Sequence, residues 1–186
     1  MEHKKEKNAL LIIDPQVGFC CQSSKHVFNV IEGLLPLFRS EIVCVSTFFN
    51  PEGSMLKRLK NWHRFDDSYP EDRELALSFP AEIKPAIFLI DTDNKVIDPL
   101  NGKSPLLAHL KSQRVTKVFI CGVSSDCSIL DTARGLFDYG ILTYIIENAC
   151  ASNKDIEHHE AAMLLLKRHP GQEFVISSDQ IQTHLS

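Results

Sequence analysis

Cys127 is the residue whose type and position most favour catalytic chemistry. It follows a turn of small and polar residues at 122–126, which comes directly after an apolar run. The segment after the turn is expected to be helical, so Cys127 falls in the first helical turn. Free N–H groups and the positive end of the helix dipole favour a thiolate there. The same N–H groups can hold an oxyanion, so the segment predicts attack on a carbonyl carbon.

Asp14 is the matching candidate for a general base. It ends the first apolar run of the chain, at residues 9–13. A carboxylate close to a thiol can take its proton and pass it to a leaving amine, and a neighbouring ammonium group stabilises both anions. Taken alone, an Asp in this position is more often a loop cap, so its role depends on the rest of the pattern.

The elements that must position these two residues alternate along the chain. Apolar runs of strand length are separated by polar or helical segments, which is typical of an α/β fold with an open parallel sheet covered by helices on both sides. In such sheets ligands bind outside the carboxyl ends of the strands, where Asp14 and Cys127 fall. The expected strands are residues 9–13, 42–48, 86–90, 117–123, 142–146 and 174–176, and the expected helices are 27–38, 105–113, 126–139 and 155–168.

The bulk properties favour one globular domain over residues 1–186. Apolar residues make up 44% of the chain, and the formal net charge is −4, so nucleic-acid binding is disfavoured. No apolar run approaches the ~20 residues that span a bilayer, so no membrane interaction is expected. The six cysteines show no CxxC spacing, which favours reduced thiols in the cytoplasm. The adjacent Cys20 and Cys21 leave a redox or thiol-sensing role open.

Three motifs resemble one protein family. Residues 13–16 (Ile-Asp-Pro-Gln) with Phe19, residues 122–127, and residues 131–140 with their Asp-Thr-Ala-Arg start are similar to the isochorismatase-like cysteine hydrolases. This superfamily includes nicotinamidases and N-carbamoyl amidohydrolases. The resemblance implies a three-layer α/β/α sandwich with a parallel, Rossmann-like sheet of about six strands. Dimers or tetramers are common among such relatives, so a homo-oligomer is expected.

The resemblance also implies an Asp–Lys–Cys triad. Carried over by position, Asp14 is the base and Cys127 the nucleophile. A cis peptide bond is expected between Val123 and Ser124, with the N–H groups of Ser124 and Cys127 as oxyanion donors. For the lysine, Lys95 fits the family spacing after the third strand better than Lys103 does.

The sequence departs from nicotinamidases at the metal site. Those relatives carry Asp-x-His after the second strand, whereas this chain has Phe48-Phe49-Asn50, so neither a metal nor another cofactor is expected. The irregular region 50–85 is expected to form a lid over the substrate or a subunit contact. Phe19, Phe49, Trp62 and Arg64 are predicted to line the pocket, with Arg64 pairing a substrate carboxylate. The alternative is that Trp62 and Phe65 anchor the loop and the charged residues face water.

Together these features predict a hydrolase that acts on a small amide, ureido or related acyl compound through a thioester on Cys127. Its partner is then a small-molecule substrate. The altered surroundings of the lysine and the missing metal ligands leave a second hypothesis open, in which the protein has lost turnover and binds a ligand or a partner.

Overall fold

Six parallel strands form one sheet in the order β3-β2-β1-β4-β5-β6, in a computed structural model that describes residues 7–97, 102 and 104–185. The predicted parallel sheet is therefore confirmed. β1 lies in the middle, between β2 and β4, so its residues are buried on both faces. The strands are β1 Lys7–Ile13, β2 Ile42–Phe48, β3 Ala86–Ile90, β4 Val115–Val123, β5 Leu142–Ala151 and β6 Val175–Ile176.

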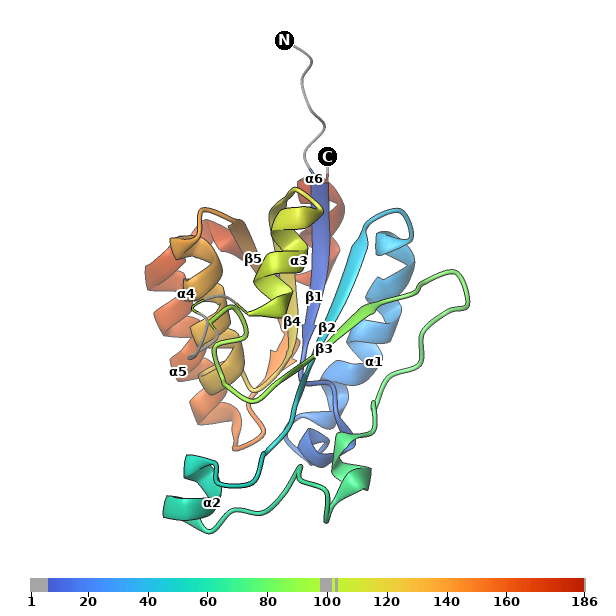
Figure 1. Cartoon of the computed structure of the whole chain (residues 1–186). Coiled ribbons are helices and arrows are strands. Elements are labelled where there is room, and N and C mark those ends of the chain that lie inside the picture. The colour runs from blue at the N-terminus through green and yellow to red at the C-terminus, as the bar shows by residue number, and fades with distance from the viewer. Residues whose placement is uncertain (1–6, 98–101, 103, 186) are drawn as a thin grey trace.

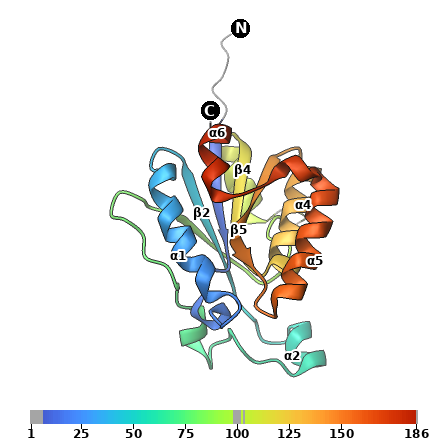
Figure 2. The same cartoon turned by 180° about the vertical axis from the view of Figure 1, so that it is seen from behind.

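Helices cover both faces of the sheet, which gives the three layers that the resemblance implied (Figures 1 and 2). Alternate residues of β1 point to opposite faces: Leu10 and Ile12 pack with α1 and α6, whereas Leu11 and Ile13 pack with α3, α4 and α5. Among the described helices none is long and apolar enough to cross a membrane. The helices are α1 Lys25–Leu34, α2 Met55–Lys60, α3 Pro105–Ser112, α4 Leu130–Asp138, α5 Ile156–Leu166 and α6 Ile181–Leu185.

Two predicted helices differ from the structure near their ends. The helix expected at residues 27–38 is α1 followed by a 3₁₀ turn at Leu35–Phe38, because Pro36 lacks the N–H that would continue the α-helix. The helix expected from residue 126 begins instead with a π-helical turn at Ser125–Ile129, and α4 starts after it. The second difference changes the surroundings of Cys127.

Gly122 allows β4 to lie close against the end of β1. Its φ is +121°, and a Cβ atom built on it would lie 2.1 Å from the carbonyl oxygen of Ile13. Any other residue would therefore collide with the backbone that carries Asp14. This glycine is what brings the turn before Cys127 and the end of β1 together.

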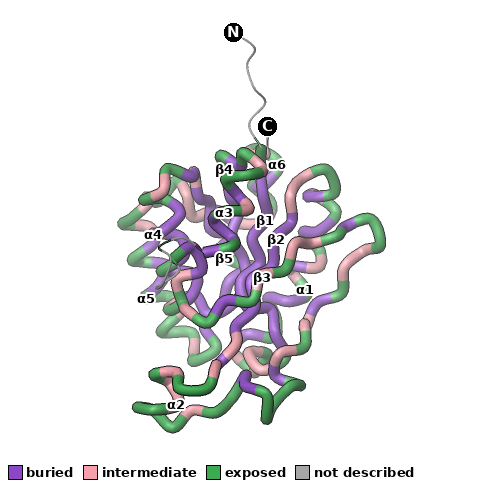
Figure 3. Tube along the Cα trace, viewed as in Figure 1, coloured by how far each residue is buried: buried purple, intermediate pink, exposed green. Residues whose placement is uncertain are grey.

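The region at residues 50–85 contains two short helices, α2 and a 3₁₀ turn at Pro70–Arg73. In Figures 1 and 2 α2 lies apart from the three layers, beyond the end of the sheet to which β2 leads. Figure 3 shows that α2 is mostly exposed, in contrast to the buried sheet. The region is thus placed to form one side of a site at the carboxyl ends of the strands.

Candidate active site

Asp14 and Lys95 form a buried ion pair at the carboxyl end of β1. Lys95 Nζ lies 2.9 Å from Asp14 Oδ2, and their side chains are 0% and 1% exposed. Ser128 Oγ donates a hydrogen bond to the same carboxylate oxygen, at 3.0 Å. Burial raises the pKa of Asp14 above its usual value, although the charge of Lys95 opposes the shift. Asp14 Oδ1 has no hydrogen-bond partner among the described residues, so it is available to a proton or a substrate.

Contacts on both sides of Lys95 hold it in this position. Its backbone N–H donates to Thr132 Oγ1 at 3.0 Å, and its carbonyl accepts a hydrogen bond from Ser104 Oγ. Lys95 Nζ also lies 5.2 Å from the centre of the Phe48 ring, within the range of a cation–π contact. The alternative lysine, Lys103, lies outside the described residues.

The turn that carries Cys127 leaves its side chain exposed. The peptide bond between Val123 and Ser124 is cis. Within the π-helical turn, the Cys127 N–H donates to the Ser124 carbonyl at 3.2 Å, and the Ile129 N–H donates to the same oxygen at 3.1 Å. The expectation that the Cys127 N–H is a free oxyanion donor is therefore wrong, because the turn already uses it.

The thiol of Cys127 is less acidic than the sequence suggested. Partial burial, together with the carboxylates of Asp126, Asp93 and Asp131, raises its pKa to about 11, and the weaker effect of Lys60 opposes the shift. The expected stabilisation of a thiolate by a helix N-terminus is thus outweighed by desolvation and nearby negative charge. This raised pKa favours the protonated thiol of Cys127 in the free protein at neutral pH.

The pKa of the Cys21 thiol shifts in the opposite direction to that of Cys127. Partial burial raises the pKa of the Cys21 thiol, but hydrogen bonds with Ser23 and Ser24 outweigh it, and the net shift is downward. Its sulfur lies 3.0 Å from Ser23 Oγ and 3.3 Å from Ser24 Oγ. All six cysteines are free thiols. The thiol-sensing role of Cys20 and Cys21 stays a prediction.

We expect iodoacetamide to alkylate Cys21 before Cys127 at pH 7 to 8, because only the thiolate reacts. Cys127 is exposed, so its slow reaction reflects the proton and not restricted access. Its rate should rise about tenfold per pH unit towards its pKa of about 11. Peptide mass spectrometry of each cysteine across this range provides the measurement.

The variant Asp93→Asn sharpens the alkylation experiment. It removes one of the carboxylates that raise the Cys127 pKa, so Cys127 should react faster at pH 8 while Cys21 is unchanged. Rapid alkylation of Cys127 in the unchanged protein at pH 7 would contradict this account of the site.

A cavity of about 410 Å³ joins these residues, with Asp14, Ser124 and Cys127 in its lining. Of the four predicted pocket residues, Phe19 and Trp62 line it, whereas Phe49 and Arg64 do not. The remaining lining residues are Phe48, Leu56, Lys60, Asp93, Ser128 and Asn153.

The two misplaced residues have other partners. The guanidinium of Arg73 lies 5.2 Å from the centre of the Phe49 ring. Arg64 makes two hydrogen bonds to the Asp72 carboxylate, Nε to Oδ2 at 2.9 Å and Nη2 to Oδ1 at 2.5 Å. The predictions for Phe49 and Arg64 are therefore wrong, and Arg64 already has a carboxylate partner within the chain.

Aromatic rings form one wall of the cavity. Phe65 is fully buried and stacks on Phe19 with the ring centres 4.1 Å apart. Phe48 and Trp62 also pack against Phe65, with ring centres at 5.8 and 5.6 Å. Trp62 therefore both anchors the loop and lines the cavity, so the two readings of this residue are compatible.

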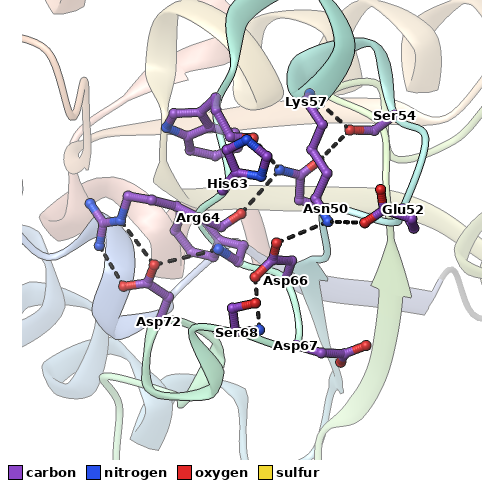
Figure 4. Close-up of polar contacts among 12 residues, drawn as sticks. Asn50, Glu52, Ser54, Lys57, His63, Arg64, Asp66, Asp67, Ser68 and Asp72 are labelled. Carbon is purple, nitrogen blue, oxygen red and sulfur yellow. Dashed lines mark hydrogen bonds and ion pairs between the residues drawn. The ribbon is translucent and has the colours of Figure 1, made fainter.

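The residues in place of the nicotinamidase metal ligands do not fit a metal. The Asn50 side-chain amide donates to the carbonyls of Trp62 and Arg64, at 2.8 and 3.1 Å, and its oxygen accepts from Ser54 Oγ at 2.5 Å (Figure 4). Asn50 thus holds the loop in place. Within the described part of the chain, no three His, Cys, Asp or Glu side chains are grouped in a way that could hold a metal ion.

Comparison with known proteins identifies the family. The sequence model of the isochorismatase domain matches residues 8–180, which is most of the chain. A search of curated proteins finds no significant sequence match.

Solved structures share the fold at low sequence identity. An isochorismatase-like hydrolase from Alkaliphilus metalliredigens has a TM-score of 0.73 and 16% identity, over 97% of this chain and 100% of that one. Nicotinamidase from Bacillus subtilis has a TM-score of 0.72 and 20% identity, over 92% and 99%. A cysteine hydrolase from Pseudomonas syringae pv. phaseolicola has a TM-score of 0.75 and 15% identity, over 96% and 92%. Because the domain match extends over nearly the whole length, the chain belongs to the isochorismatase family of hydrolases.

Proposed function

We propose that the protein is a cysteine-dependent hydrolase of small amides or ureido compounds. The observation that carries the proposal is the buried Asp14–Lys95 ion pair, which reaches the same cavity as Cys127 through Asp14. A buried charge pair costs desolvation energy, so its place beside a nucleophile supports a catalytic role more than a stabilising one. The solved nicotinamidase with this fold hydrolyses an amide, which agrees with the proposed reaction class.

In the first half-reaction, the Cys127 sulfur attacks the carbonyl carbon while its proton passes to Asp14 Oδ1. The raised pKa of Asp14 makes it a stronger base than an exposed carboxylate. Lys95 lies 2.9 Å from the other carboxylate oxygen and keeps the carboxylate oriented and ionised until the transfer. The tetrahedral intermediate then breaks its C–N bond, and Asp14 returns the proton to the leaving amine.

In the second half-reaction, water attacks the thioester carbonyl. Asp14 takes a proton from the water, the C–S bond breaks, and Asp14 passes the proton to the leaving sulfur, which gives the carboxylic acid, the Cys127 thiol and the Asp14 carboxylate. Since the Cys127 N–H is bonded to Ser124, the Ser124 N–H is the remaining proposed donor to the oxyanion. The overall reaction consumes one amide and one water, and it yields one acid and one amine.

The proposal is tested by trapping the thioester. The protein is incubated with a panel of primary amides and N-carbamoyl compounds, and ammonia release is measured. For any compound that releases ammonia, acid quenching and peptide mass spectrometry should find the acyl group on Cys127. Turnover with the acyl group on another residue, or with no acyl-enzyme under rapid quenching, would argue against the proposed mechanism.

A second candidate function is ligand binding without turnover. The pKa of about 11 favours it, because a neutral thiol is a poor nucleophile until a base takes its proton. Saturable binding of amides to the cavity, with no ammonia released and no acyl group on Cys127, would favour this second function.

A further inference from the structure

We propose that the cavity selects amides that also carry an anionic group, and that Lys60 binds that group. This inference rests on the proposed function and names its substrate class. Lys60 is the one basic side chain among the described residues that line the cavity. No sequence pattern distinguishes Lys60 from the other exposed lysines of the chain.

The charge of Lys60 has no partner in the part of the chain that the structure describes. Lys60 forms no ion pair with any residue that the structure describes, whereas Lys57 on the same helix bridges Glu52 and Asp66, at 2.8 and 2.9 Å. Lys95 is likewise paired, with Asp14. An unpaired cation on a cavity wall can form a charge-assisted hydrogen bond with a bound carboxylate.

Buried contacts fix the helix that carries Lys60. Lys57 has a side chain only 9% exposed and joins α2 to Asp66, which is 7% exposed. Ser54 caps the start of α2, and its hydroxyl also donates a hydrogen bond to Asn50 (Figure 4). The start of α2 is therefore tied to the loop as well. Lys60 is therefore presented by an anchored segment, which lowers the entropic cost of holding a ligand.

Asp93, which forms no ion pair with the described residues, indicates where a substrate anion is disfavoured. Asp93 is at the reacting end, because Ser128 Oγ lies 3.4 Å from Asp93 Oδ1 and 3.0 Å from Asp14 Oδ2. A substrate anion there would face two carboxylates. We therefore place the neutral amide beside Asp14 and Cys127 and the anionic group beside Lys60, all of which line the cavity.

The apolar part of the cavity lining sets the remaining chemistry of the substrate. It is formed by Phe19, Phe48, Leu56 and Trp62, so the middle of the substrate is apolar or planar. A cavity of about 410 Å³ is near the lower end of the ~300–1,000 Å³ found for ligand pockets. The substrate class is thus a small amide whose carboxylate is separated from the carbonyl by a short apolar or aromatic spacer.

Trp62 provides a binding signal that does not depend on turnover, because it is the only tryptophan of the chain and lines the cavity. Its fluorescence is titrated with two matched pairs of amides at low ionic strength. The pairs are succinamate with 4-methylpentanamide and 3-carbamoylbenzoate with 3-isopropylbenzamide, in which an isopropyl group replaces the carboxylate. Ammonia release is recorded in parallel.

The anionic member of at least one pair should bind about tenfold more tightly, and added salt should reduce the preference. Lys60→Gln should remove the preference. Arg58→Gln should keep it, because Arg58 is an exposed cation of the same helix that does not line the cavity.

Equal binding of both members of each pair, no binding of either anionic amide at millimolar concentration, or an unchanged preference in Lys60→Gln would overturn the inference. A charge preference without ammonia release leaves the anion site standing and counts against the hydrolase. Ammonia release without a charge preference supports the hydrolase and counts against the anion site.

Discussion

Cys127→Ala should lower the rate of amide hydrolysis by about four orders of magnitude or more, because the proposed covalent route attacks through the Cys127 sulfur. Asp14 reaches the same cavity, but it is the base and is paired with Lys95. Residual hydrolysis would come from direct attack by water on the bound amide. The measurement is the rate of ammonia release with the best amide of the panel.

The same substitution should leave the fold intact. Cys127 is exposed, and among the described residues its sulfur makes one long hydrogen bond, 3.9 Å to Asp126 Oδ2. Thermal unfolding should therefore change little, and amide binding measured by Trp62 fluorescence should persist. Cys20→Ala is the matched control, since Cys20 is an exposed thiol outside the cavity and should keep full activity. Full activity of Cys127→Ala would falsify the proposed mechanism.

Burial patterns made the sheet predictable. The runs at residues 9–13 and 42–48 contain apolar residues on consecutive positions, as a strand covered on both faces requires, and they are β1 and β2. The end of β5 was less predictable, because Glu147 and Asn148 interrupt its apolar pattern although the strand continues to Ala151. The pairing of β5 with β4 shifts register at this point, and β5 is buried again from Ala149 to Ala151, so the two polar residues mark an irregularity within the strand and not its end.

The positions of Asp14 and Cys127 at the ends of strands could be predicted from the sequence. Asp14 and the turn before Cys127 follow strands, so their meeting is a consequence of the parallel sheet. The sequence analysis predicts Phe49 in the cavity lining, but the structure places Phe48 there and Phe49 beside Arg73. Successive residues of an extended chain point to opposite sides, and sequence alone does not show which side faces the site.

The loop residues depended on contacts that sequence does not reveal. Arg64 pairs with Asp72, eight positions later. The contacts of Asn50 with the Trp62 carbonyl and of Lys57 with Asp66 hold the loop in the conformation in which Lys60 lines the cavity. No periodic pattern encodes these contacts, and a lysine in a loop is usually solvated. Asp93 was missed for the same reason, although it lies only two residues before Lys95.

Lys95→Met should destabilise the fold by about 3–5 kcal/mol, the usual cost of leaving one member of a buried ion pair without its partner. Both side chains are at most 1% exposed, so solvent cannot replace the lost contact. Asp14→Asn should also destabilise, because it leaves the Lys95 ammonium buried. Urea unfolding of each variant measures the free energies, and both variants should lose most of their activity.

The double variant Asp14→Asn/Lys95→Met separates electrostatics from packing. With both charges gone, its stability should return to within about 1–2 kcal/mol of the original protein, since neutral replacements of a buried pair are often tolerated. If its loss equals the sum of the two single losses, the pair does not interact across the 2.9 Å contact as described.

The pH dependence of Lys95→Met gives an independent check. Without the opposing charge of Lys95, burial raises the pKa of Asp14 further in the folded protein, while the unfolded value stays near 3.9. The folded state then binds the extra proton, so its stability falls as pH rises from the unfolded to the folded pKa. The deficit of Lys95→Met should be larger at pH 8 than at pH 5. An equal deficit at both values would mean that the cost is lost packing, and the ion pair would then be a structural feature of β1 that the proposed chemistry does not use.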